Sequence, residues 1–227
     1  MKRFIWSASF LVALPLLSVT LMSTQAAPIA VGSKGGPSTV PIPAGIGGKW
    51  TLDPMHSRIG FVIRHVMIND IHGSFGDFSG NLDVNQKDFT KSSVNFTAKI
   101  ASIDTKVAPR DAHLKSPDFF GAAKYPEMTF RSQRVMRSGN GFRVLGVFTM
   151  HGVSRSIIIP FTAKGPVKDG FGTTRAGVKA RFDLNRQDYG VKWNQKLDNG
   201  GMALDDIVHV ELDLEATKDG MTPKKPS

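Results

Sequence analysis

The sequence predicts an all-β domain, an antiparallel sheet of about eight strands with one short helical insert. Apolar and polar residues alternate with a period of two through most of the chain beyond the N-terminal region, which is typical of strands with one buried face. Short turns rich in Gly, Asn and Asp separate these segments, as in antiparallel hairpins. The only helix-like block, residues 110–120, interrupts the alternation. A lone insert of this kind favours a closed sheet with a lid or plug.

The expected strands follow one another with short connections. Alternation is clearest where Val94, Phe96 and Ala98 face one way and Asn95 and Thr97 the other, which indicates one dry and one wet face. Periodicity alone does not decide between a barrel and a sandwich. In order, the expected strands are a short one at 50–53 and longer ones at 57–67, 78–84, 93–100, 128–136, 141–150, 154–163, 176–184 and 208–214.

Ser116-Pro117-Asp118 predicts the start of a helix. Ser is a favoured N-cap and Pro fits the first helical position. A helix starting here would present Phe119 and Phe120 to the sheet. This segment is the candidate lid.

The N-terminal region predicts export. Lys2-Arg3, the apolar run 4–22 and Thr24-Gln25-Ala26 match a secretory signal peptide at 1–26, cleaved after Ala26. An uncleaved membrane anchor is the alternative, since the apolar run is almost long enough to span a bilayer. We therefore expect a periplasmic protein with a flexible Gly/Pro-rich linker at 27–48, a barrel domain at 49–217 and a disordered basic tail at 218–227.

Charge and cysteine content exclude several classes of function. The formal net charge of +10 falls to +8 once Lys2 and Arg3 leave with the signal peptide. The remaining basic residues are spread along the strands, and an exported protein rarely meets nucleic acid, so we expect no nucleic-acid partner. Anionic lipid head groups, an acidic partner or simple solubility could account for the charge. The absence of cysteine excludes disulfides, thiol catalysis and Cys-based metal or iron–sulfur sites.

Several motifs together resemble the YceI family of exported lipocalin-like proteins. The helical block Arg110-Asp111-Ala112-His113-Leu114-Lys115-Ser116-Pro117-Asp118-Phe119-Phe120 is the most specific of them. The resemblance covers essentially residues 50–216. The other matching segments are 50–57 with Phe61 and His65, then 73–80, 104–105, 124–132, 146–153 and 185–190. The chain departs from the family pattern at Ser154-Arg155-Ser156, which lacks the usual proline, and in the added linker.

The resemblance implies an eight-stranded antiparallel lipocalin-like barrel with a ligand tunnel and no established catalytic activity. It also implies that the barrel holds a long-chain amphiphilic lipid, a polyisoprenoid or an isoprenoid quinone, which it sequesters or carries. We expect no other cofactor. Transient membrane contact and the choice between monomer and homodimer stay open, as does a stress-related scaffold without ligand.

Many aromatic residues lie on the apolar faces of the expected strands, more than one interior usually holds. Ligand pockets are lined mainly by apolar and aromatic groups. An ordinary packed core is the alternative and must account for some of them. The candidate lipid-binding residues are Phe61, Ile63, His65, Phe75, Phe78, Phe96, Phe119, Phe120, Phe130, Phe148 and Phe182.

Arg110, Asp111 and His113 could form a polar entrance for a head group, because Arg110 and His113 are one helical turn apart. Alternatively they form a structural network in which Asp111 caps the helix and Arg110 pairs with a strand carboxylate. His65 falls in phase with Phe61 and could either bond a head group or bond backbone at the strand end.

We expect no metal site and no catalytic residue. His56 and His65 are nine apart, which does not place them on one strand face, and His72 adds no known ligand spacing. The enzyme alternative would pair His65 or His113 with a carboxylate such as Asp111 for acid–base chemistry on a lipid-like substrate. No nucleophile motif supports it, since Gly-x-Ser-x-Gly does not occur.

Overall fold

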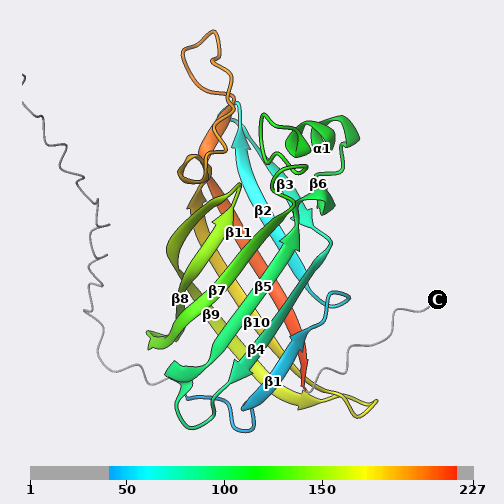
Figure 1. The fold of residues 1–227 in the computed structure, drawn as a ribbon, viewed down its shortest axis with the longest axis vertical. Coiled ribbons are helices and arrows are strands. Elements are labelled where there is room, and N and C mark those ends of the chain that lie inside the picture. Colours follow the sequence, from blue (N-terminus) through cyan, green and yellow to red (C-terminus); the bar gives the residue numbers. More distant parts are fainter. Residues whose placement is uncertain (1–40, 219–227) are drawn as a thin grey trace, which may run out of the picture. The chain divides into compact units, whose positions relative to one another are not determined.

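A computed structural model describes residues 41–218 of the chain, which form an antiparallel sheet that closes on itself (Figure 1). Around the barrel the order is β1-β4-β5-β7-β8-β9-β10-β11, and β11 pairs with β1. The expected eight-stranded antiparallel barrel with one short helix is confirmed. The elements are β1 Gly48–Leu52, β2 Arg58–His65, β3 Asn69–Phe75, β4 Phe78–Val84, η1 Phe89–Lys91, β5 Ser93–Lys99, η2 Ile100–Ser102, β6 Ile103–Asp104, α1 Ala108–Lys115, β7 Glu127–Ser138, β8 Gly141–Met150, β9 Val153–Lys168, β10 Thr174–Asn185, η3 Arg186–Tyr189 and β11 Leu204–Lys218.

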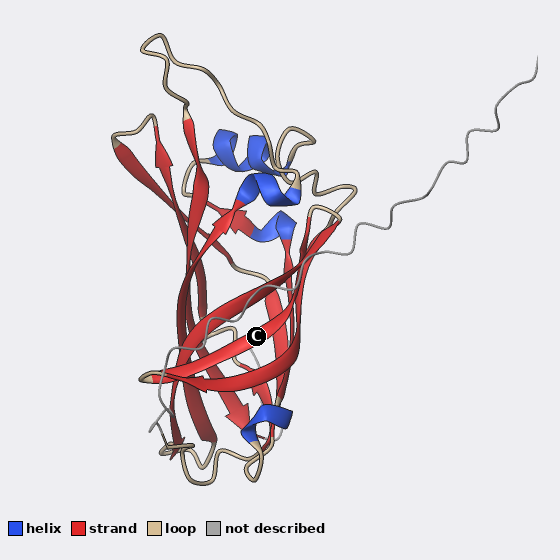
Figure 2. Ribbon diagram, turned by 90° about the vertical axis from the view of Figure 1, so that its left-hand side faces the viewer, coloured by secondary structure: helices blue, strands red, loops and turns tan. Residues whose placement is uncertain are grey.

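The first and last strands close the barrel. Trp50 of β1 pairs with Lys218 of β11, and β2 continues along the same strand with Ile59 opposite Leu212. The strands β1 and β2, β3 and β4, and β5 and β6 therefore act as three long strands, each broken once. Beyond the break, β2, β3 and β6 extend the sheet, and α1 lies at that end of the barrel (Figure 2).

Two glycines in the wall make room for phenylalanine rings. Phe61 faces Gly73 across the β2–β3 pair, and a Cβ on Gly73 would lie 2.2 Å from Cζ of Phe61. A Cβ on Gly146 would likewise lie 2.4 Å from Cζ of Phe130. Both rings have this room because Gly73, opposite Phe61, and Gly146, diagonal to Phe130 on the neighbouring strand, carry no side chain.

The sequence did not predict β3 or the short β6. In β3 the inward positions are Ile71, Gly73 and Phe75, so one of the three apolar signals is missing. The remaining alternation is too short to stand out from a loop. The strand forms because β2 supplies its hydrogen-bonding partner over the full length, from His65 opposite Asn69 to Ile59 opposite Phe75.

The helix prediction was wrong in position. The helix α1 ends where we expected one to begin, and Ser116 is its C-cap with extended backbone angles. Pro109 occupies the first turn, where a missing N–H costs nothing, whereas Pro117 forces the residue before it out of the helical region. The segment with Phe119 and Phe120 is consequently a turn that follows the helix.

The described end of the expected linker packs against the barrel. Ile46 is buried in the core, and Nε1 of Trp50 donates to its carbonyl oxygen at 2.7 Å. The expected signal peptide, the linker as far as residue 40 and the tail from residue 219 lie outside the described residues. Within residues 41–218 no helix has the length and apolar character needed to span a membrane.

Candidate functional site

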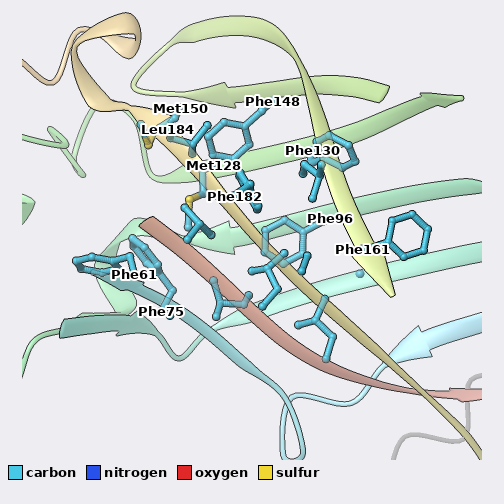
Figure 3. A pocket seen from close by; sticks show the side chains of 18 of the residues that line it. Phe61, Phe75, Phe96, Met128, Phe130, Phe148, Met150, Phe161, Phe182 and Leu184 are labelled. Atoms are coloured by element: carbon cyan, nitrogen blue, oxygen red, sulfur yellow. The ribbon is translucent and has the colours of Figure 1, made fainter. Parts of the chain in front are cut away.

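The barrel encloses a cavity of about 430 Å³ whose lining is almost entirely apolar. This volume lies within the range of about 300–1,000 Å³ typical of small-molecule sites. Side chains from strands all around the barrel point into the space, as Figure 3 shows for Phe61, Phe96, Phe130, Phe148 and Phe182. Such an interior can hold an apolar chain but offers almost no hydrogen bonds along its length.

Most of the candidate lipid-binding residues line this cavity, and their contact with a ligand stays a prediction. Phe78 is the exception. It is buried, but its ring packs in the core beside Phe96, with ring centroids 6.4 Å apart, and does not line the cavity. Alternation gives the face of a residue but not its depth along the barrel. The residues that do line it are Phe61, Ile63, His65, Phe75, Phe96, Phe119, Phe120, Phe130, Phe148 and Phe182.

The sequence did not indicate several other residues that line the cavity. Trp193 lies in the long connection between η3 and β11, where no periodic pattern marks it. Met128 and Phe161 lie on strands with less regular alternation, whereas Met150 is the last residue of β8. The apolar phase of β8, with Val144, Gly146, Phe148 and Met150 as alternate residues, was the signal that could have found Met150.

One end of the cavity is covered by an aromatic cluster. The ring of His113 packs edge-on against Phe119 and Trp193, with centroids 4.9 and 5.2 Å apart. Phe120 packs edge-on against Phe75 at 6.1 Å. All five side chains line the cavity, and His113 belongs to α1, so this cluster joins α1 to the cavity wall. The proposed lid thus contains Trp193 besides the two phenylalanines.

The expected polar entrance is partly a structural network. Oδ1 of Asp111 accepts hydrogen bonds from the backbone N and Oγ1 of Thr105, and Asp111 does not line the cavity. Arg110 donates from Nε and Nη2 to Thr105 at 2.7 Å in each case. The head-group role expected for Asp111 gains no support from this position and stays a prediction. Its carboxylate is used to fix the chain that leads into α1.

Arg110, His113 and His65 do line the cavity. Nη1 of Arg110 has no hydrogen-bond partner within residues 41–218, and neither has the ring of His65. Nε2 of His113 lies 3.1 Å from Oδ2 of Asp118, an exposed carboxylate. No hydrogen bond within the described chain joins Asp111 to either histidine, so the carboxylate paired with His113 is Asp118 and not Asp111.

A cluster of ionisable groups lies where β1 turns into β2. Ligand atoms of Asp53, His56 and Glu215 lie within 4.8 Å of one another. Nη1 of Arg175 is 2.9 Å from Oδ2 of Asp53 and 2.5 Å from Oε1 of Glu215. A guanidinium between the two carboxylates already supplies the positive charge that a metal ion would bring, so this arrangement is an ion-pair network.

Asp53 should make folding stability depend on acid pH. Its side chain is only 1% exposed, and burial raises its pKa, but hydrogen bonds from His56, Arg175 and the backbone N–H of Met55 outweigh burial and hold the pKa below 3.8. A carboxyl whose pKa is depressed on folding stabilises the fold above its unfolded pKa and loses that contribution as the pH falls through the folded pKa. We expect the free energy of unfolding to drop below about pH 4.

Urea unfolding between about pH 6 and pH 2 measures this drop. Asp53→Asn should lower stability at neutral pH and flatten the acid slope, because the titrating group is gone. Asp198→Asn is the control, since Asp198 is exposed and has no ion pair within residues 41–218. If Asp53→Asn left the fall of the unfolding free energy at acid pH unchanged, other carboxyl groups would be its cause.

The family model described as YceI-like domain matches residues 50–216. A UPF0312 protein of Photorhabdus laumondii is 38% identical over 144 residues, which cover 63% of this chain and 75% of that protein. Protein YceI of Escherichia coli O157:H7 is 33% identical over 156 residues, or 69% of this chain and 81% of that protein.

A solved structure shares the fold. It is a polyisoprenoid binding domain from Saccharophagus degradans, implicated in plant cell wall breakdown, with a TM-score of 0.54 and 15% identity over 74% of this chain and 98% of that one. At that identity the likeness concerns the fold alone.

Proposed function

This chain belongs to the YceI-like domain family, and we propose that it binds a long-chain amphiphilic lipid inside its barrel, with a polyisoprenoid or isoprenoid quinone as the ligand. The observation that carries the proposal is the cavity of about 430 Å³ with its apolar lining. The fold shared with a polyisoprenoid binding domain supports the ligand class. The work is binding, with no bond broken, and its place is the periplasm, as the sequence of residues 1–26 suggests.

Energetics favour an apolar chain. Each buried methylene contributes roughly 0.8 kcal/mol, so about ten buried carbons give about 8 kcal/mol before any cost. Ordering the chain removes a good part of this. The net affinity suits a protein that sequesters a lipid and can still release it.

The head group would lie at the end of the cavity next to α1. The side chains of Arg110, His113 and His65 bring polar atoms to that end, and Nη1 of Arg110 can donate to an oxygen of the ligand. A guanidinium binds anionic and oxygen-rich groups well. The apolar chain would then extend between β5 and β10, past Phe96 and Phe182.

Native mass spectrometry of the protein, purified from its exported compartment without detergent, tests the proposal. Solvent extraction then identifies any released compound. A stoichiometric prenyl or acyl lipid is the expected result. A protein that is empty and also fails to bind added prenyl lipids would overturn the proposal and favour the scaffold alternative.

The aromatic cluster at the α1 end should slow ligand release. Replacing Phe119 and Phe120 together with alanine removes the rings that pack on Trp193 and Phe75. We expect a dansyl-labelled farnesol to dissociate at least about tenfold faster, because these rings no longer cover the end of the cavity. Differences in affinity between related complexes fall mainly on dissociation rates. Stopped-flow fluorescence measures the rate. Phe171→Ala, at a residue 97% exposed, is the control, and equal rates for the double variant and the control would remove the lid function.

A further inference from the structure

The connection between β2 and β3 presents apolar side chains to solvent. Met67 is 53% exposed and Ile68 84%, and Met202 in the neighbouring loop is 49% exposed. We call these three residues the tip. Single exposed apolar residues are common and mean little, so the backbone and the surroundings of the tip must carry the argument.

The backbone of this turn is strained. Val66 and Met67 both have positive φ, 45° and 64°, and the N–H of Ile68 donates to the carbonyl of His65 at 3.1 Å. Turns with two such central residues favour Asn-Gly, since a β-branched side chain fits this conformation poorly. The chain thus keeps large apolar residues where the fold would prefer small polar ones, and such strain collects at functional positions.

The turn is also held in place. The N–H of Val66 donates to the carbonyl of Ala203 at 2.7 Å. Met67 lies over Gly201, where a Cβ would come within 2.5 Å of its Cε. These contacts join the turn to the loop that carries Met202, so the three apolar side chains are presented together.

The tip adjoins the cavity. His65 precedes the turn and Leu204 follows the loop, and both line the cavity together with Arg110 and His113. The β2–β3 turn and this loop lie at the same end of the barrel as α1 (Figure 1). The end that would hold the head group is therefore the end that carries the tip.

The charges near the tip are close to balanced. Arg64 pairs with Asp70 at 2.7 Å. The connection from residue 190 to 203 carries Lys192, Lys196 and Asp198, and Asp205 and Asp206 follow it. Long-range attraction to an acidic partner or an anionic membrane is therefore weak here. A stable interface between proteins takes about 20–30 residues a side, far more than three side chains. The partner that fits the tip best is therefore the uncharged apolar region of a lipid bilayer.

We propose that the tip inserts into the interfacial region of a lipid bilayer and holds the α1 end of the barrel against the membrane. The choice of a lipid surface rests on the proposed lipid-binding function, because the cargo would reside in a bilayer. Inserted apolar side chains provide the binding, so salt should have little effect.

Flotation with vesicles of pure phosphatidylcholine tests the proposal. The double variant Met67→Asn/Ile68→Ser should partition onto vesicles at least about tenfold less than the wild type, because it removes two large apolar side chains. Asn tolerates positive φ, so the variant should unfold at the same urea concentration or a higher one. Phe171→Ser is the matched control, an exposed aromatic on the β9–β10 hairpin at the opposite end of the barrel (Figure 1).

The docking proposal would be overturned if the wild type did not bind these vesicles, if wild type and tip variant bound them equally, or if Phe171→Ser abolished binding. Vesicle binding that disappears between about 50 and 500 mM salt would also overturn it, in favour of charge-driven contact. A homodimer that the tip variant loses would assign the tip to a second copy.

Binding of dansyl-labelled farnesol, measured without vesicles, separates the two proposals. The tip variant should bind this probe as the wild type does. A wild type that binds vesicles through the tip but no farnesol would refute the proposed ligand and leave docking in place. A wild type that binds farnesol but needs no tip for vesicle binding would refute docking alone.

Discussion

Ala180→Trp is expected to weaken the binding of a long-chain isoprenoid at least about a hundredfold while the barrel stays folded. Ala180 is 5% exposed and lines the cavity in the middle of β10. Its cross-strand partners Phe161 and Leu212 line the cavity too. An indole at this position would take the space of the ligand chain. Because the cavity offers room, the stability cost should stay within the roughly 1–3 kcal/mol of an overpacked core.

Fluorescence titration with dansyl-labelled farnesol measures the affinity, and urea unfolding measures the stability. Arg181→Trp is the matched control, since the next residue along β10 points outward and its side chain is 79% exposed. It should bind the probe like the wild type. If Ala180→Trp bound farnesol with unchanged affinity, the lipid would have to lie outside the barrel.

Arg186→Met is expected to destabilise the fold by about 3–5 kcal/mol. The side chain of Arg186 is only 3% exposed. It donates to the carbonyl oxygens of Asp205, Val191 and Trp193 at 2.8, 2.9 and 2.8 Å. Burial lowers the pKa of this guanidinium, and the nearby carboxylates of Asp206 and Asp205 oppose the shift. A thioether would leave the three carbonyls without partners.

Urea unfolding at neutral pH measures this loss. Arg181→Met is the control, because its pair with Glu211 lies at the surface and such pairs contribute about 0–1 kcal/mol. The same bonds hold the chain around Trp193, so Arg186→Met should also speed farnesol release. An equal, small loss in both variants would show that other contacts hold this loop.

Periodicity predicted most of the strands because inward and outward positions alternate along each one. It missed β3, where Gly73 removes one apolar signal and the ring of Phe61 takes its place. It misplaced the helix, since Ser116 and Pro117 suit a helix start as well as the chain leaving one. The same residues carry the family resemblance, and the helix that they form ends at Lys115 instead of beginning at Ser116.

The sequence also could not distinguish residues that line the cavity from residues that are packed in the core. Phe78 and Phe96 are both in phase with the apolar faces, yet only Phe96 lines the cavity. Where empty space remains depends on the volumes of side chains from strands far apart in sequence. Arg110 and Asp111 are neighbours in the helix, and only the position of Thr105 shows how each is used.

The sequence by itself determined the all-β class, the inward face of most strands and the family, because these depend on residue order along single segments. The tertiary structure decided the closure of β1 on β11, the cavity, the buried bonds of Arg186 and the joining of Asp53 with Arg175 and Glu215. These features require residues distant in the chain to meet. Their energies come from packing and desolvation at the meeting points, which no local pattern contains.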